Sequence, residues 1–467
     1  MDLEPARDAF AAADVERLSA ELAALFPNDP EVARVQEFAR FTLHGGAFPA
    51  DASPATRIFL EHIARISPRP VTAEQTLSPA PAPGPAPAPA PAPAPISAAA
   101  PASAARNSRR FLSRDLDFIA DLAGIVRWSI AQTLNRFVMD RIEPKKRAAV
   151  VGTMRDDGIY IMEFVAHYLA LGFEHIFIYT NDNADSSLDL LDVLSEHGLI
   201  TVLESEVTGK VPPEAKAFGY ALNLLDELRD YEWALFVDSD EFLVPEVRYE
   251  FSIDAVLDAL AREDSQGRVA GICYDWLWFI SDMVFERTPG LLCERFQHAK
   301  PHWLAKCLVR VRDVISMRHQ HYPEVATGFT VVDSLFEPLD LATIWQRRQA
   351  QYGGGRINHY WPRSFEEFAI KKARGASLEM QDNQYDRPYE QFFSWNGHSA
   401  AENSHPTDPK HLRKVKDQID ALRALEGVAA VADRIEREFS SFLARVTPHQ
   451  DLRAEYAKNR AEPVDFT

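Results

Sequence analysis

Residues 231–245 read YEWALFVDSDEFLVP. Five apolar residues, 233–237, indicate a buried strand, and three carboxylates, Asp238, Asp240 and Glu241, follow it almost at once. In open α/β sheets the ligand crevice lies beyond the carboxyl ends of the strands, which is where these carboxylates stand. Asp238 and Asp240, separated by one serine, can converge on one hard divalent cation through their oxygen atoms. The stretch therefore predicts a buried strand that ends in a metal or ligand site.

Three strand and helix pairs precede this stretch. The expected strands are 147–154, 175–179 and 199–203, and the expected helices are 159–171, 187–197 and 216–229. Strands that alternate with helices of this length indicate a mostly parallel sheet with right-handed crossovers. Polar residues follow each expected strand, so they should meet at one edge of the sheet. We expect an α/β fold in which helices flank this sheet.

The composition excludes several classes of protein. With 46% hydrophobic and 25% charged residues in a chain of 467, the protein is globular. A net charge of −19 disfavours a nucleic-acid partner, because phosphate binding needs a basic face. Neither GxGxxG after the first strand nor GxxxxGK[ST] occurs, which disfavours a Rossmann dinucleotide domain and a P-loop NTPase.

Cysteine usage and apolar runs bear on the compartment. The three cysteines, Cys273, Cys293 and Cys307, show no CxxC spacing, so we expect no disulfide framework and a reducing, cytoplasmic location. The N-terminus lacks a signal-peptide pattern, and no run reaches 18 apolar residues. The nearest, Phe118–Met139, is amphipathic. We expect it to pack on the next domain, with peripheral contact at the inner face of a membrane as the alternative.

Changes in composition divide the chain into five segments. Residues 1–70 show helical spacing and form a small module that is a candidate for a protein partner. Residues 71–105 are a Pro/Ala-rich linker, because proline fixes φ and removes hydrogen-bond donors. A connecting amphipathic helix at 106–146, the α/β domain at 147–407 and a helical C-terminal tail at 408–467 complete the predicted organisation.

Three blocks of the α/β domain together resemble a known family. They are TMRDDGIYIMEFVAHYLALGFEHIFIYTNDNADSS at 153–187, WALFVDSDEFL at 233–243 and INHYWPRSFEEFAIKKARG at 357–375. They are similar to bacterial family-2-like glycosyltransferases related to glycosyltransferase family 92, which have the GT-A fold. The resemblance covers about 147–375. The family usually has a Lys-Asn-Glu-like triplet where this chain has Arg155-Asp156-Asp157, and often a Gln where the nearby polar residue here is Lys216.

The resemblance implies transfer of a sugar from a nucleoside diphosphate donor to a hydroxyl acceptor, with inversion at the anomeric carbon. It also implies Mn²⁺ or Mg²⁺ as cofactor, held by Asp238 and Asp240, because such ions neutralise the departing diphosphate. His319 or His321 is the expected further metal ligand, although a histidine is more often a satisfied polar residue. Surface polysaccharide or another glycan is the acceptor that family analogy suggests.

Other residues are expected to bind the donor, the acceptor or the acceptor proton. The candidates for donor binding are Thr153, Arg155, Asp157, Asp182, Lys216, Ser239, His359, Lys372 and Arg374. Those for the acceptor are Glu241, which could instead pair with a Lys or Arg, and Trp278, which could instead be core. The catalytic base should be a carboxylate beyond the metal motif, and we prefer Asp282 to Asp275. The basic residues of the third block, Arg363 and those at 371–374, should begin a helix at 365–373, where both the helix N-terminus and the cations favour phosphate.

Two alternatives remain at this stage. A haloacid-dehalogenase-like phosphatase also places Asp-x-Asp after a strand, but there a Gly-Thr-like pair normally follows, whereas here Glu241-Phe242 follows. A degenerate transferase that acts as a non-catalytic scaffold would not need the acidic motif, which is intact in this chain.

Overall fold

The computed structural model describes residues 109–113, 116, 142–207, 211–326, 328–347, 349–375, 388–396 and 404–461. The predicted N-terminal module (1–70), the linker (71–105) and most of the connecting helix (106–146) lie outside the described residues. Among the described residues no helix is long and apolar enough to cross a membrane.

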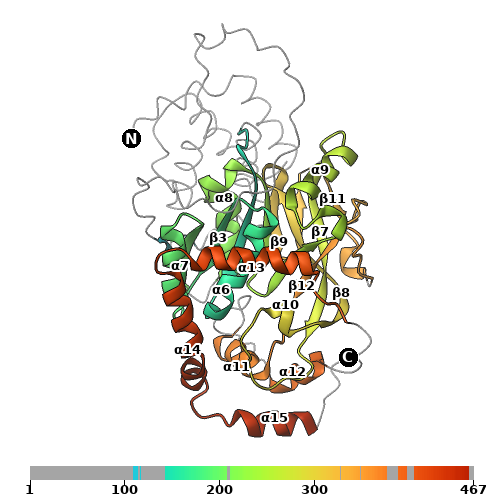
Figure 1. Ribbon diagram of the computed structural model, residues 1–467. Coiled ribbons are helices and arrows are strands. Elements are labelled where there is room, and N and C mark those ends of the chain that lie inside the picture. The colour runs from blue at the N-terminus through green and yellow to red at the C-terminus, as the bar shows by residue number, and fades with distance from the viewer. Residues whose placement is uncertain are drawn as a thin grey trace, which may run out of the picture.

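One large mixed sheet forms the centre of the protein (Figure 1). Its strands are β1 (Arg110–Leu112), β2 (Lys146–Met154), β3 (His175–Thr180), β4 (Ile200–Ser205), β5 (Tyr231–Asp238), β6 (Glu241–Pro245), β7 (Val269–Ile280), β8 (His298–Arg310), β11 (Thr330–Asp333) and β12 (Gly355–His359). The order is β1-β4-β3-β2-β5-β8-β7-β12-β6, and β11 also pairs with β7. Only the β5–β8, β8–β7 and β12–β6 pairs of this sheet are antiparallel, so the predicted mostly parallel, GT-A-like sheet is confirmed.

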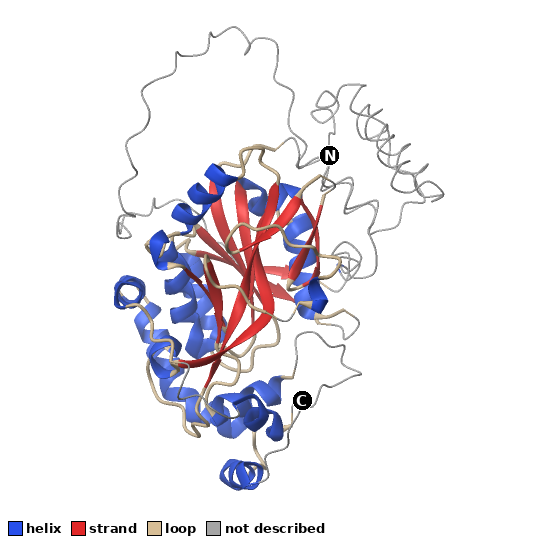
Figure 2. Cartoon of the chain, turned by 90° about the vertical axis from the view of Figure 1, so that its right-hand side faces the viewer, coloured by secondary structure: helices blue, strands red, loops and turns tan. Residues whose placement is uncertain are grey.

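Helices cover both faces of this sheet (Figure 2). They are α6 (Gly158–Leu171), α7 (Ser187–Glu196), α8 (Pro213–Leu224), α9 (Ile253–Glu263), α10 (Leu292–Arg295), α11 (Phe365–Arg374), α12 (Tyr389–Asn396), α13 (Pro409–Arg423), α14 (Val428–Val446) and α15 (Leu452–Ala461). A separate hairpin consists of β9 (Val314–His319) and β10 (Tyr322–Val325). The C-terminal segment is thus helical, and α13 and α14 pack on α6.

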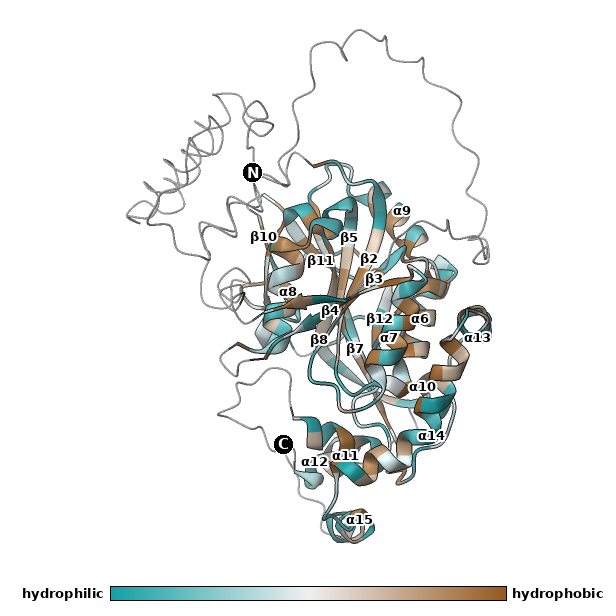
Figure 3. Ribbon diagram, turned by 90° about the vertical axis from the view of Figure 1, so that its left-hand side faces the viewer, coloured by the Kyte–Doolittle hydropathy of each residue, from teal (hydrophilic) through white to brown (hydrophobic). Residues whose placement is uncertain are grey.

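The core lies on the two faces of the sheet. One cluster joins alternate residues of the central strands, such as Val150 and Leu235, to α6, α7, α9 and α14. The other joins their neighbours, such as Val151 and Phe236, to α8. This alternation follows from the two-residue period of a strand, and a strand that is buried on both faces reads as a continuous apolar run. Figure 3 shows such apolar residues along the strands.

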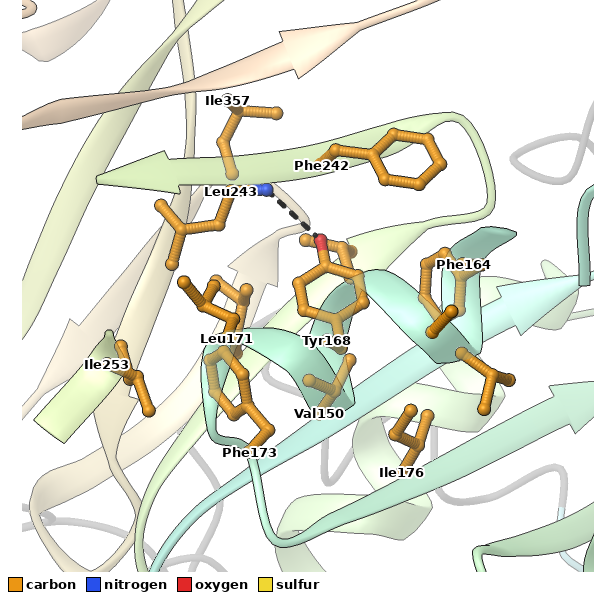
Figure 4. Packing of buried hydrophobic residues seen from close by; sticks show 14 of the residues in the cluster. Val150, Phe164, Tyr168, Leu171, Phe173, Ile176, Phe242, Leu243, Ile253 and Ile357 are labelled. Atoms are coloured by element: carbon orange, nitrogen blue, oxygen red, sulfur yellow. Dashed lines mark hydrogen bonds between the residues drawn. The ribbon is translucent and has the colours of Figure 1, made fainter. Parts of the chain in front are cut away.

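Tyr168 connects this core to the turn after β5. Its ring packs in the cluster of Figure 4, among Phe164, Phe173 and Leu243. Its hydroxyl donates to the backbone carbonyl of Glu241 at 2.7 Å and lies 3.4 Å from the backbone nitrogen of Leu243. The fully buried side chain of Tyr168 therefore stabilises the backbone of the acidic turn at 238–241.

Local sequence explains where key helices begin and end. Gly172 ends α6 in the left-handed conformation (φ 101°), which a residue without Cβ adopts at little cost. Ser364 and Glu367 form a reciprocal capping box at the start of α11. Both boundaries agree with the elements expected at 159–171 and 365–373.

Two parts of the described structure differ from expectation. Residues Arg110–Leu112 form a strand, parallel to β4, at the edge of the sheet. Cys273 and Cys307, which are direct cross-strand partners on β7 and β8, form a disulfide. The expected absence of a disulfide was wrong, because the spacing of cysteines in sequence does not report the register that brings two strands together. The cytoplasmic location stays a prediction.

Candidate active site

A pocket of about 450 Å³ opens at the carboxyl ends of the central strands. Its walls come from the ends of β2, β3, β4 and β5, from β7, β8 and β12, and from the last turn of α11. They include Thr153, Met154, Arg155, Asp157, Tyr179, Thr180, Asn181, Ser205, Glu214, Asp238, Ser239, Asp240, Trp276, Trp278, His302, His321, His359, Trp361, Lys371, Arg374 and Trp395. The pocket thus lies where the sheet topology predicts a ligand crevice.

Asp238, the last residue of β5, is fixed by three neighbours. Its Oδ1 accepts a hydrogen bond from Thr153 Oγ1 at 2.8 Å, and its Oδ2 accepts one from Lys306 Nζ at 3.0 Å. Its backbone N–H donates to the carboxylate of Glu241 at 2.9 Å. The Asp238 side chain is 31% exposed, so one side of it remains open to the pocket.

Lys306, on β8, is the centre of a buried charge cluster behind Asp238. Its fully buried Nζ lies 3.0 Å from Asp238, 3.4 Å from Glu241 and 3.6 Å from Glu214. Burial lowers the pKa of Lys306, but these carboxylates raise it by more. Burial also raises the pKa of Glu241 well above its ordinary value, against the opposing charge of Lys306. Glu241 is therefore the paired acid that was one of its two expected roles.

Asp240 lies in the turn after β5 and has basic partners of its own. Its Oδ2 accepts a hydrogen bond from Lys371 Nζ at 2.5 Å and lies 3.7 Å from Arg363. Its Oδ1 lies 3.6 Å from His359 Nε2. Burial raises the pKa of Asp240, but Lys371, His359 and Arg363 lower it by more, so this carboxylate is ionised. Burial lowers the pKa of His359 to about 3, so this imidazole is neutral.

Asp157 completes the acidic centre from the loop before α6. It accepts hydrogen bonds from Ser239 Oγ at 2.6 Å and from Arg363 at 3.4 Å, and it pairs with Arg374 at 2.7 Å. Burial raises the pKa of Asp157, but Arg374 and Arg363 lower it by more. Each of these three carboxylates thus pairs with at least one buried cation, and Lys371 and Arg374 also line the pocket.

The two ends of the pocket differ in chemistry. At the β2–β4 end the lining is polar, with Thr180, Asn181 and Ser205 at successive strand ends. At the β7–β12 end it is aromatic, with Trp276 and Trp278 on β7 and other aromatic rings around them. The acidic and basic centre lies between them, because β5 and β2 are the middle strands of the sheet.

The structure brings most of the expected site residues to this pocket. Those that line it are Thr153, Arg155, Asp157, Asp238, Ser239, Asp240, Trp278, His321, His359 and Arg374. Among the described residues of the pocket wall, Asp182, Lys216, Glu241, Lys372, Asp275 and Asp282 do not appear.

Contacts explain why several candidates lie elsewhere. Lys216 donates to the backbone carbonyls of Ser113 and Glu206, so it ties the segment before the domain to the sheet. Lys372 lies over the ring of Tyr389, whereas the adjacent Lys371 enters the pocket, which reverses the expected preference.

The two candidate bases lie apart from the pocket. Asp275 is buried and receives both guanidinium nitrogens of Arg347, at 2.7 and 2.6 Å, and the backbone N–H of Gln351. Burial raises the pKa of Asp275 to about 6, against these partners. Asp282 is 43% exposed and pairs with His298 at 2.6 Å. Of the two, Asp282 alone is accessible.

Of the two candidate histidines, His319 and His321, only His321 has a side chain in the described part of the structure. His321 lines the pocket, and its Nδ1 hydrogen-bonds the carbonyl of Ala305 at 3.0 Å, which places the proton on Nδ1. His319 ends β9, and its side chain lies outside the described part of the structure.

The basic helix is oriented differently from the expectation. The N-terminus of α11 is closed by its own capping box, and Lys371, Lys372 and Arg374 belong to its last turn. The prediction that a helix N-terminus would bind phosphate here was therefore wrong, and the charged side chains themselves face the pocket. Lys371, Arg363 and Lys306 were not among the predicted site residues. A lysine inside the apolar strand around residues 303–311 was the signal for Lys306, since a lysine is rarely fully buried unless it is paired.

The donor set suits a divalent cation only in part. Among the described residues no group of three or more His, Cys, Asp or Glu side chains could hold a metal. Asp238 and Asp240 nevertheless flank one pocket. Mg²⁺ and related ions commonly take one or two carboxylates and complete their shell with substrate phosphates and water. The residues therefore fit a cation that arrives with a phosphorylated ligand.

Comparisons with known proteins agree with this geometry. The sequence model described as glycosyltransferase family 92 matches residues 154–360. No curated protein sequence gives a match. Among solved structures, TarS 1-349 from S. aureus is 12% identical and covers 67% of this chain and 88% of that chain, with a TM-score of 0.25. The same fragment in complex with UDP is 13% identical and covers 65% and 72%, with a TM-score of 0.24.

A putative glucose-1-phosphate thymidylyltransferase from Bacillus anthracis is 9% identical and covers 36% of this chain and 72% of that chain, with a TM-score of 0.21. At these TM-scores the structural likenesses carry no argument about function. The family match does, because it spans every strand that builds the pocket from the end of β2 to β12. It gives no support to the phosphatase alternative. Residues 154–360 are therefore similar to glycosyltransferase family 92, and this similarity supports a glycosyltransferase.

Proposed function

We propose that this enzyme transfers a sugar from a nucleoside diphosphate donor to a hydroxyl group of a glycan acceptor. The observation that carries the proposal is the centre of the pocket, where Asp157, Asp238 and Asp240 alternate with Lys371 and Arg374. Carboxylates that can share a cation and side chains that bind phosphate are both needed at a diphosphate.

The polar and aromatic ends of the pocket suggest how the donor is oriented. The polar strand ends around Thr180, Asn181 and Ser205 suit the base and ribose, because hydroxyl and amide groups can bond to both. The diphosphate then lies over the charged centre, beside Lys371 and Arg374. The sugar points toward the aromatic end.

We further propose Mn²⁺ or Mg²⁺ as cofactor, held by Asp238 and Asp240 together with the donor phosphates. When bound, the cation supplies Lewis-acid neutralisation of the departing diphosphate. Lys306 holds Asp238 in place, and Thr153 fixes its second oxygen. His321 lines the same pocket, and its Nδ1–H bond to the carbonyl of Ala305 fixes the orientation of its ring.

The transfer step requires a base on the acceptor side. The acceptor oxygen bonds to the anomeric carbon while the bond from that carbon to the diphosphate oxygen breaks, and the acceptor proton passes to a carboxylate. We propose inversion. Neither candidate carboxylate lines the pocket, and Asp282 is the one whose side chain is accessible, since Asp275 is closed off by Arg347. Asp282→Asn should abolish turnover while nucleotide binding persists. Unchanged turnover would remove Asp282 from the mechanism.

A donor screen tests the proposed function. The protein is mixed with Mn²⁺ and a panel of UDP-, GDP- and CDP-sugars, and binding and nucleoside diphosphate release are measured. We expect one nucleotide class to bind and to release its diphosphate, and Asp240→Asn to lose this response. Asp254→Asn, on the exposed side of α9, is the matched control and should behave as wild type. A protein that binds no member of the panel would contradict the proposal.

A further inference from the structure

Six aromatic side chains form one wall of the pocket, at the end away from β4. This aromatic wall consists of Trp276, Trp278, His302, His359, Trp361 and Trp395. The rings come from β7, β8, β12, the loop after β12, and α12. Elements far apart in the sequence thus converge on one aromatic surface.

The rings of the aromatic wall contact one another and form a continuous surface. Trp276 and His359 have ring centroids 4.2 Å apart, and Trp278 lies 5.0 Å from His302 and 4.7 Å from Trp395. Trp361 and Trp395 continue the wall, with centroids 3.8 Å apart. Such mutual support fixes ring positions, so the wall is a preorganised binding surface.

Core packing accounts for only part of this wall, because Trp276 and Trp361 belong to core clusters. Aromatic rings of a core are closed off by other apolar side chains, whereas these rings border a pocket whose centre is charged. Trp278 and Trp395 are only partly buried. The wall begins beside Asp240, because His359 Nε2 lies 3.6 Å from its Oδ1.

Three polar atoms of the wall have no hydrogen-bond partner among the described residues. They are Nε1 of Trp276, Nε1 of Trp278 and Nδ1 of His359, and each is closed to solvent. A buried polar group without a partner costs about 1–3 kcal/mol, so such groups are normally satisfied. A ligand that reaches them through a small rotation of the rings would relieve this cost.

The hydrogen-bonding character of these atoms is specific. Each indole N–H is a donor only. Nε2 of His359 faces the carboxylate of Asp240 at 3.6 Å, which favours a proton on Nε2 and leaves Nδ1 as an acceptor. Two donors and one acceptor, set in an aromatic surface, match a ligand whose hydroxyl groups both donate and accept and whose ring has an apolar C–H face.

We propose that the aromatic wall is a subsite for a pyranose sugar, which packs its C–H face on Trp278 and Trp395 and directs hydroxyl groups to the ring edges. The proposal rests on the proposed function, because that function places a sugar beside the diphosphate. The sugar has two possible sources with the same chemistry, the donor's own sugar and a saccharide acceptor.

The test compares ligands with and without a sugar on variants of the wall. Binding of UDP, UDP-glucose, UDP-galactose and UDP-N-acetylglucosamine is measured by calorimetry with Mn²⁺, and binding of lactose and cellobiose is measured with UDP present. The variants are Trp278→Leu, Trp278→Phe and Trp395→Leu. Melting temperatures identify any variant that fails to fold, and the two tryptophans lie on different elements, so each serves as a check on the other.

A donor-sugar subsite predicts that both Leu variants lose about tenfold in affinity for a sugar nucleotide while their affinity for UDP stays unchanged. An acceptor subsite predicts the same loss for a disaccharide with the sugar nucleotides unaffected. Trp278→Phe should fall within about threefold of wild type in either case, because the aromatic face remains. Folded Leu variants that bind every sugar ligand as wild type does would overturn the proposal.

Binding by the wild-type protein tests the proposed function independently of the wall variants. If wild type binds none of these nucleotides and no GDP- or CDP-sugar of the donor screen, the proposed function fails. A disaccharide that binds alone and is lost in the Leu variants would still support the wall. If wild type binds nucleotides but no ligand gains affinity from its sugar, the wall fails as a sugar subsite and the donor centre stands.

Discussion

Replacement of Lys306 by Met tests the buried charge cluster behind the pocket. The ammonium lies 3.0, 3.4 and 3.6 Å from Asp238, Glu241 and Glu214, and its side chain is fully buried. Removal of one partner from a buried ion pair costs about 3–5 kcal/mol, because the remaining charge stays desolvated and uncompensated. Lys306→Met should therefore lower the free energy of unfolding by about that amount at pH 8.

The loss of unfolding free energy caused by Lys306→Met should depend on pH, and the raised pKa of Glu241 determines its direction. Burial already raises the pKa of Glu241, and loss of Lys306 raises it further. A carboxylate with a raised native pKa binds more protons in the folded state than in the unfolded state, so stability falls as pH rises. The deficit of Lys306→Met should therefore be larger at pH 8 than at pH 6, and Glu241→Gln in the same chain should recover part of it.

Urea unfolding followed by tryptophan fluorescence measures these free energies. The matched control is Lys416→Met, which removes a surface pair with Glu294 at 2.6 Å whose side chains are 49% and 36% exposed. It should cost less than about 1 kcal/mol. A loss below about 1 kcal/mol for Lys306→Met, or no recovery in the double variant, would refute the role of Lys306 as the compensating charge.

Two further predictions concern binding and acid stability. Lys371→Met should bind Mn²⁺ about tenfold more tightly without nucleotide, since Asp240 loses a competing cation, and should bind UDP with Mn²⁺ more weakly, as measured by electron paramagnetic resonance and calorimetry. Lys372→Met is the matched control, and equal Mn²⁺ affinities in all three proteins would argue against the competition. Burial lowers the pKa of His411 to about 2, so folding should lose stability as pH falls below about 6.5, by roughly 2 kcal/mol at pH 5 for this group. In urea unfolding, His411→Gln should remove this part of the stability loss at acid pH. His449→Gln, at an exposed position, is the control and should keep it. Identical pH profiles of stability in both variants would contradict the role of His411.

Local patterns predicted most of the fold because each pattern has a local cause. The apolar run at 233–237 is β5 because its residues are buried on both faces of the sheet. Gly172 marked the end of α6 because the left-handed conformation there favours glycine. The carboxyl ends of parallel strands share an edge, so Asp238 and Thr153 could be predicted to meet.

Pairings between distant elements were not predictable in this way. Lys306 and Lys371 reach the acidic turn from β8 and α11, and their partners depend on register and helix rotation, which one sequence does not show. The Cys273–Cys307 disulfide depends on the same register. Asp275 was a candidate base because it lies beyond the metal motif in sequence, but Arg347 occupies its carboxylate.

A crystal structure with Mn²⁺ and the nucleoside diphosphate identified by the donor screen tests the central claim most directly. We predict an anomalous manganese peak between Asp238, Asp240 and the two phosphates. We also predict the nucleobase beside Asn181, with the diphosphate near Lys371 and Arg374. A nucleotide bound elsewhere on the protein, or diphosphate density that contacts neither the acidic turn nor the last turn of α11, would contradict it.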